Sequence, residues 1–212
     1  MKIALLNENS QASKNKMIYE ALKKVCDKKD FEIYNYGMHE GSTANLTYVQ
    51  LGLLAGILIN SKAVDFIITG CGTGEGAMLA LNSFPNVLCG LIIDPTDAYL
   101  FGQINNGNAI SIPYAKGFGW GAELTLDNIF ETLFKEEFGN GYPRERAIPE
   151  QTNKKILDDI RSITIKDMMT ILKNIDQEFL KKTIDNEYFK ENFFKNSKDE
   201  EMNAYLKSVL EK

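Results

Sequence analysis

Short runs of β-branched and other apolar residues recur along the first half of the chain, with longer segments of helical period between them. Runs of this length, bounded by Gly, Asn, Asp or Pro, are typical of β-strands. They predict strands over Lys2–Leu6, Phe31–Tyr36, Asp65–Thr69, Val87–Ile93 and Ala109–Pro113. The last three runs are almost continuously apolar, which indicates parallel strands that are covered on both faces.

Segments with an apolar stripe at helical spacing lie between and after these runs. In Lys14–Lys28 the apolar residues recur at intervals of one and four, which places them on one side of a helix. Similar patterns predict helices over Leu46–Ser61, Glu75–Ser83, Asp97–Asn105 and Trp120–Phe138. Strict alternation of strands and helices predicts an α/β fold: a doubly wound, three-layer α/β/α domain with a five-stranded parallel sheet.

The composition changes after Tyr142–Arg146. Glycine disappears, Lys, Asp and Glu become more frequent, and helical patterns continue to Lys212. We therefore divide the chain into a domain of residues 1–148 and a C-terminal helical extension of residues 149–212. The extension is expected to pack against the domain or a partner subunit through one apolar face, formed by Ile156, Ile160, Ile163, Ile165, Met168, Met169, Leu172 and Ile175.

The charge balance excludes some classes of protein. With 24 Lys and Arg against 29 Asp and Glu, the net charge is −5, which argues against a nucleic-acid groove or a membrane surface as the partner. The longest apolar stretch, Leu51–Ile59, is far shorter than the roughly 20 residues that span a bilayer.

Three cysteines without CxxC spacing indicate neither a disulfide framework nor a zinc site. The first residues lack the apolar core of a signal peptide, so we expect a cytoplasmic protein.

A glycine-rich turn, Gly70–Gly76, follows the third predicted strand and precedes a predicted helix. Its glycines allow backbone N–H groups to converge at a helix N-terminus, where they can bind an oxyanion. Cys71 lies in this turn, where the helix dipole is expected to favour its thiolate. A thiolate beside such donors can move a proton α to a carbonyl, with the N–H groups holding the enediolate. Glu75, in the first helical turn, is the alternative base, or only complements the dipole.

Other interpretations of this turn remain. The glycines could serve only close packing, and cysteine is often an inert buried residue. The segment Gly72–Ala77 also satisfies the G-x-G-x-x-A pattern of a dinucleotide-binding turn, and Asp94 follows at the end of the next strand. However, only two predicted strands follow, too few for the usual six-stranded dinucleotide sheet. A nucleotide- or dinucleotide-binding oxidoreductase is therefore the rival hypothesis.

Arginine is scarce, yet two of the three arginines, Arg144 and Arg146, lie together after Tyr142. Arginine binds phosphate through two parallel hydrogen bonds, so these residues are candidates for holding an anionic group, unless they form only a solvated surface turn. The only histidine, His39, lies in a polar loop. A metal site and the histidine-dependent hydrolase mechanisms are therefore disfavoured.

The turn Gly70–Gly76, the pair Asp94-Pro95 and the segment Gln103–Asn108 follow one another in an order that resembles the ribose-5-phosphate isomerase B / galactose-6-phosphate isomerase family. The similarity covers about the first 148 residues. It implies a Rossmann-like fold, a homodimer or dimer of dimers with sites at the subunit interface, and aldose–ketose isomerisation of a pentose or hexose phosphate through a cis-enediolate. No cofactor and no metal are implied. A non-catalytic sugar-phosphate-binding protein is a further alternative.

The resemblance also implies roles for individual residues. Cys71 takes the place of the proton-transferring cysteine, and Arg146, with Arg144 beside it, would hold the phosphate across a dimer interface. The oxyanion donors would be Gly72, Thr73, Gly74 and Gly76, and Asn105 would contact the substrate. We expect Glu8, Asn9 and Asp94 to contact substrate hydroxyls as well.

The sequence departs from the family pattern at several of these positions. Glu8 and Asn9 replace the usual Asp-His pair, and Tyr142 stands in place of a phosphate-binding arginine. Ile104 replaces the histidine that helps to open the sugar ring. The loss of this histidine permits a substrate that is already open-chain.

Overall fold

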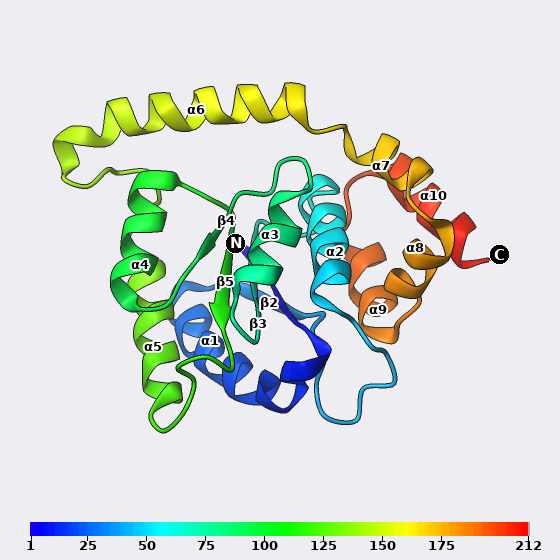
Figure 1. The fold of residues 1–212 in the computed structure, drawn as a ribbon, viewed down its shortest axis with the longest axis horizontal. Helices are drawn as coiled ribbons and strands as arrows, with labels where there is room; N and C mark the ends of the chain where they lie inside the picture. The colour runs from blue at the N-terminus through cyan, green and yellow to red at the C-terminus, as the bar shows by residue number, and fades with distance from the viewer. Residues whose placement is uncertain (212) are drawn as a thin grey trace.

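Five parallel strands pair into one sheet, as the sequence pattern predicts. The computed structural model describes residues 1–211. The strand order is β2-β1-β3-β5-β4, so the chain starts inside the sheet and winds first to one edge and then to the other (Figure 1). The strands are β1 (Lys2–Asn7), β2 (Glu32–Asn35), β3 (Phe66–Cys71), β4 (Cys89–Leu91) and β5 (Ala109–Pro113). The predicted strands are confirmed, with β4 shorter than expected.

Helices cover both faces of the sheet and complete the three layers (Figure 1). Successive residues of a strand point to opposite faces. Phe66 and Ile68 of β3 accordingly pack with α1, α4 and α5, whereas Ile67 packs on the side of α2 and α3. These helices are α1 (Asn15–Lys29), α2 (Tyr48–Asn60), α3 (Glu75–Asn82), α4 (Pro95–Leu100) and α5 (Ala122–Leu133), with a 3-10 turn η1 (Asn9–Lys14) before α1 and a π-helical turn η2 (Phe101–Asn105) after α4. The Rossmann-like α/β/α fold is confirmed.

The C-terminal region is helical throughout, as predicted. Its last four helices gather beside α2, on the side away from the sheet (Figure 1). Leu172, Phe193 and Leu206 of this group belong to the same buried cluster as Leu54 of α2, so extension and domain share one core on this side. The helices are α6 (Ala147–Thr164), α7 (Met168–Asn174), α8 (Gln177–Ile184), α9 (Glu187–Asn196) and α10 (Glu200–Leu210). The division of the chain after residue 148 stays a prediction.

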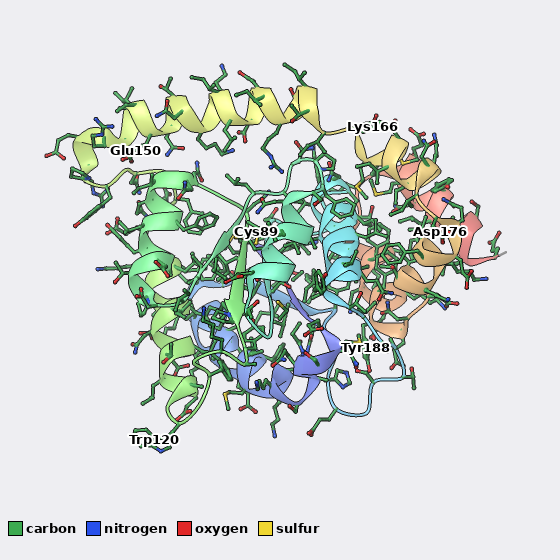
Figure 2. The ribbon with its side chains drawn as sticks, viewed as in Figure 1. Cys89, Trp120, Glu150, Lys166, Asp176 and Tyr188 are labelled. Carbon is green, nitrogen blue, oxygen red and sulfur yellow. The ribbon has the colours of Figure 1, made fainter. Side chains whose placement is uncertain are left out.

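The apolar residues predicted to form one face of the extension lie on separate helices, and those of α6 do not pack against the domain. Ile156, Ile160 and Ile163 of α6 are 50, 51 and 85 % exposed, and α6 contains no buried residue. The chain leaves the helical conformation between α6 and α7, so the two helices present their apolar residues to different surroundings. In Figure 2, Glu150 labels the first turn of α6 and Lys166 the chain just after its end, and the helix runs along the outside of the molecule.

Helix α2 is apolar on every side because it lies between the sheet and the extension. All residues from Gln50 to Leu58 are buried. The helix begins with a capping box, in which the N–H and hydroxyl of Thr47 both donate to Gln50 Oε1, at 3.0 and 3.1 Å. Across the part of the chain that the structure describes, residues 1–211, no helix is both long and apolar enough to span a membrane.

Arg161 fastens α6 to the loop between α3 and β4. Its Nη2 atom donates to the carbonyl oxygens of Val87 at 2.6 Å, Phe84 at 3.2 Å and Asn82 at 3.3 Å. We expect Arg161→Met to lower the free energy of unfolding by about 1–3 kcal/mol, because these carbonyls lose a charged donor. Urea denaturation measures the change, with Lys155→Met on the same helix as the control. Equal unfolding midpoints for the two variants would show that Arg161 does not anchor the helix.

Candidate functional site at the turn between β3 and α3

The predicted glycine-rich turn connects the carboxyl end of β3 to α3. Cys71 is the last residue of β3, and α3 begins at Glu75. Between them Gly74 has a φ of +77°, a left-handed conformation that strongly favours glycine. A Cβ at this position would also lie 2.6 Å from Leu91 Cδ1. Glycine at position 74 is therefore required for this connection.

Contacts from β5 and the loop after it hold the turn in place. Ser111 Oγ is fully buried and donates to the carbonyl oxygen of Gly74 at 2.6 Å. Beyond the end of β5, the N–H of Tyr114 donates to the carbonyl oxygen of Cys71 at 2.9 Å. These bonds fix the orientation of the peptide groups on both sides of the turn, so its backbone donors are pre-organised.

The first turn of α3 offers N–H donors at the surface of the site. The first four N–H groups of a helix have no partner within the helix. In α3 one of them, the N–H of Glu75, donates to Thr73 Oγ1 at 3.3 Å. A Cβ at Gly72 would have its nearest neighbour at 3.7 Å, an ordinary contact, so packing does not require glycine there. The missing side chain instead leaves space beside the donors. An oxyanion fits these surroundings.

Cys71 is the cysteine that lies at this turn, and it is 7 % exposed. Cys26 lies on the buried face of α1, where burial raises the pKa of its thiol to about 11. Burial also raises the pKa of Cys89 in β4. Neither of these two thiols supplies a thiolate near neutral pH. The role of Cys71 as the base stays a prediction, with Glu75, exposed in the first turn of α3, as the alternative.

Glu8 and Asn9 lie beside the turn because β1 and β3 are neighbours in the sheet. Asn7, the last residue of β1, pairs with Gly70 of β3. Glu8 and Asn9 follow directly, so they reach the same edge of the sheet as Cys71. The structure thus brings these predicted residues together at the carboxyl ends of the strands, where α/β sheets bind their ligands.

Asp94 lies at the same edge of the sheet but follows β4. Because β5 lies between β3 and β4, the strands β3 and β4 are about 10 Å apart. Its carboxylate accepts hydrogen bonds from the N–H groups of Thr96 at 2.7 Å and Asp97 at 3.0 Å. Asp94 is therefore the N-cap of α4. The dinucleotide interpretation, which needs a free carboxylate for a ribose hydroxyl, loses support, and a contact of Asp94 with substrate stays a prediction.

Asn105, Arg144 and Arg146 form a second group of predicted site residues. Asn105 is the last residue of η2, and main-chain hydrogen bonds of 3.0 Å join η2 to the loop that precedes the arginines. Both arginines are exposed, and Arg144 forms an ion pair with Glu136. The group therefore offers an amide and two guanidinium groups on one open surface.

The second group is remote from the turn within one subunit. Asn105 comes four residues before Ala109, the first residue of β5. Ala109 pairs with Ile67 near the amino end of β3, whereas Cys71 pairs with the last residue of β5. The two pairs are four positions apart, about 13 Å at 3.3 Å per residue. The predicted site thus divides into a part at the carboxyl end and a part toward the amino end of the sheet.

Further side chains surround the turn that the sequence pattern does not single out. Gln11 Nε2 lies 3.9 Å from the position that a Cβ would take on Gly72. Ser111 has a signal in the sequence, because it is a polar residue in the apolar run of β5. Gln11 and Lys14 have no signal in the sequence, since the six residues of η1 show no periodicity. The side chains near the turn that the sequence analysis missed are thus Gln11, Lys14 and Ser111.

No group of three or more His, Cys, Asp or Glu side chains within residues 1–211 could hold a metal ion. His39 packs against Tyr188 of α9, labelled in Figure 2, with ring centroids 4.7 Å apart. The ring of His39 therefore contacts the extension rather than the turn. Catalysis without metal or cofactor stays a prediction.

Comparisons with known proteins identify the family. One family model, described as ribose/galactose isomerase, matches residues 3–148, and another, described as ribose-5-phosphate isomerase, matches residues 163–209. A crystal structure of 4-deoxy-L-threo-5-hexosulose-uronate ketol-isomerase complexed with a tartrate is 61 % identical, with a TM-score of 0.97 and 100 % of both chains covered. A ribose-5-phosphate isomerase from Vibrio parahaemolyticus is 48 % identical over 99 % of each chain, with a TM-score of 0.96.

More distant structures share the fold. The type B ribose 5-phosphate isomerase from Trypanosoma brucei is 18 % identical, with a TM-score of 0.63 over 75 % of this chain and 97 % of that chain. The matched residues 3–148 include the entire sheet and the turn at Cys71, which confirms the resemblance seen in the sequence. This chain therefore belongs to the ribose/galactose isomerase family of sugar isomerases.

Proposed function

We propose that this protein is a ketol-isomerase of an open-chain 4-deoxy-5-keto-hexuronate. The observation that supports this is the 61 % identity, over every residue of both chains, to the structure named for 4-deoxy-L-threo-5-hexosulose-uronate. Similarity of this extent includes the C-terminal helices as well as the sheet. The tartrate named in that complex is a dicarboxylate with two hydroxyls, so it shares a carboxylate and hydroxyls with a uronate.

The chemistry of such a substrate accounts for Ile104. An aldose closes its ring through the hydroxyl on C4 or C5. The compound named above has no hydroxyl on C4 and a ketone at C5, so neither closure is available to it. An enzyme for an open-chain substrate needs no residue that opens a ring, and Ile104 and Asn9 both stand where the family has histidine.

The reaction moves one proton between neighbouring carbons. The thiolate of Cys71 takes the proton from C2 of the aldose, and the N–H groups of Gly72–Gly76 hold the negative charge that develops on the C1 oxygen. The thiol then returns the proton to C1, and the proton on the C2 oxygen moves to the C1 oxygen, which leaves a ketone at C2. Glu75 is the alternative base for the same step.

The second group of residues reaches the turn only from another subunit, and we therefore propose a homodimer. Asn105, Arg144 and Arg146 of one copy would face Cys71 of the other. An isologous dimer forms two equal sites of this kind, because each copy supplies one part to its partner. The arginines would then bind the anionic end of the substrate.

Helix α6 has the surface that such a dimer needs. At 3.6 residues per turn, Ile163 lies about 200° around the helix from Arg161, which holds α6 to its own subunit. The stripe of Ile156, Ile160 and Ile163 therefore faces away from the body of the chain and is at least 50 % exposed. An exposed apolar stripe of this kind marks an interaction site. The stripe follows the arginines along the same segment, so one contact would bury both.

A second candidate substrate is ribose 5-phosphate. The 48 % identical structure from Vibrio parahaemolyticus is named ribose-5-phosphate isomerase, and the family model that matches residues 163–209 has the same description. Arg144 and Arg146 would hold a phosphate as well as a carboxylate. Two residues favour the uronate as the substrate. Tyr142 stands in place of a phosphate-binding arginine, and Ile104 replaces the histidine that helps to open a sugar ring.

A comparison of substrates tests the proposal. We expect kcat/KM for the 4-deoxy-5-keto-hexuronate to exceed that for ribose 5-phosphate by roughly 100-fold or more, because a site shaped for one anion leaves polar groups unpaired with another. NMR in D₂O detects turnover and deuterium incorporation for both compounds and for galactose 6-phosphate. Preference for ribose 5-phosphate would establish the second candidate, and binding without turnover of any compound would indicate a sugar-binding protein.

A further inference from the structure

Lys14 is the last residue of η1, directly before α1, and its side chain reaches the loop after β5. Its ammonium donates to Gln11 Oε1 at 2.9 Å and to the carbonyl oxygen of Tyr114. It also lies over the ring of Phe118, 5.1 Å from the ring centroid. The side chain is only partly exposed. Three neutral groups thus hold this cation in a defined position.

That position is at the edge of the catalytic turn. The N–H of Tyr114 donates to the carbonyl oxygen of Cys71, and the carbonyl of the same residue accepts from Lys14. Gln11, the other partner of Lys14, lies beside Gly72, at the open part of the turn. The ammonium is therefore connected to both sides of the space beside the N–H donors.

The charge of Lys14 is not balanced by the residues around it. Within residues 1–211 no carboxylate lies within 4.0 Å of its ammonium. An ammonium has three N–H donors, and the contacts above use two. Four of the five lysines on α1 differ, because each of these four pairs with a carboxylate: Lys16, Lys23, Lys24 and Lys28. A held cation with a free donor is suited to an anionic ligand.

We propose that Lys14 binds the carboxylate of the substrate and determines the preference for a uronate over a neutral sugar. This inference rests on the proposed function, and it adds a residue of the same subunit as Cys71 to the arginines that the other subunit would bring to the carboxylate. A Lys ammonium is a compact point charge with three donors, so an oxygen of the carboxylate can accept from it without a fixed geometry. The carboxylate would accept the free N–H of Lys14 while the reacting end of the substrate lies on the donors of the turn.

Direct binding tests this role without depending on turnover. Calorimetry measures the affinity of the full-length protein for tartrate and for tartramide, its neutral diamide. We expect Lys14→Met to weaken tartrate binding by about ten- to hundredfold and to leave tartramide binding unchanged, because the variant loses one charge-assisted hydrogen bond. Lys14→Arg keeps the charge and should restore much of the affinity. Lys16→Met removes a charge from an exposed site nearby and should behave as wild type.

Kinetics with the uronate provide the second readout. A residue that binds the carboxylate should change KM more than kcat, whereas a residue that only braces the loop after β5 should change kcat and the melting temperature. Equal losses for tartrate and tartramide, or no tartrate binding by wild type, would overturn the inference. So would a dependence on Lys14 that is stronger for inorganic phosphate than for tartrate.

The outcomes separate this inference from the proposed function. If wild type converts the uronate and Lys14→Met has an unchanged KM and tartrate affinity, the function stands and the role of Lys14 is wrong. If wild type binds tartrate through Lys14 but converts only ribose 5-phosphate, the uronate function is wrong and the carboxylate site stands.

Discussion

Replacement of Cys71 by alanine is expected to lower kcat/KM for isomerisation by about 10²–10⁴-fold, the contribution that a positioned base makes to proton transfer. Exchange of the C2 proton with solvent deuterium should fall by the same factor, because it reports the proton-abstraction step alone. The fold should survive, since the turn is held by main-chain bonds and by Ser111 rather than by the thiol. Deuterium exchange followed by NMR, with thermal unfolding of the same variant, measures both effects.

The control for this experiment is Cys26→Ala, which removes a thiol from the core side of α1. It should reduce stability through the cavity it leaves, without a matching loss of deuterium exchange. Glu75→Gln distinguishes the alternative base. Full exchange in Cys71→Ala together with its loss in Glu75→Gln would move the base to Glu75 and contradict the assignment to Cys71.

Introduction of aspartate at both Ile156 and Ile160 is expected to convert a dimer into monomers and to abolish most of the activity. Two carboxylates in the middle of an apolar contact would have to be buried without partners. The loss of activity follows because a monomer separates Asn105 and Arg146 from the turn. Sedimentation at several concentrations measures the state of association. The conservative pair Ile156→Leu and Ile160→Leu should remain dimeric and active, and a double aspartate variant that is dimeric and active would exclude α6 from the interface.

Mixing two inactive variants tests the shared site directly. Cys71→Ala and Arg146→Ala subunits, refolded together, would form heterodimers in which one site has both residues intact and the other lacks both. Half of the dimers in a random mixture are heterodimers with one working site of two, so about a quarter of wild-type activity should return. No recovery would indicate that each site is complete within one subunit.

The sequence by itself determined the sheet, most helices and the glycine-rich turn after β3. The spacing of apolar residues that predicts a strand or a helix is a local property, since it depends only on which residues close in sequence lie on the same face of the element. The glycine at 74 is equally local, because a left-handed φ excludes most other side chains at that position. The site residues at the carboxyl ends of β1 and β3 follow from a general rule of parallel sheets, so Glu8, Asn9 and Cys71 could be brought together without coordinates.

Only the tertiary structure decided which candidate residues lie near one another and which apolar residues are covered. Asn105 and Cys71 lie on elements joined by the same sheet, yet the register of β3 and β5 places them toward opposite ends. The isoleucines of α6 have the pattern of a buried face, but their exposure depends on where the neighbouring helices pack. The position of Lys14 depends on a contact with Tyr114, 100 residues away. Contacts between distant segments are set by packing and register, which no local pattern encodes.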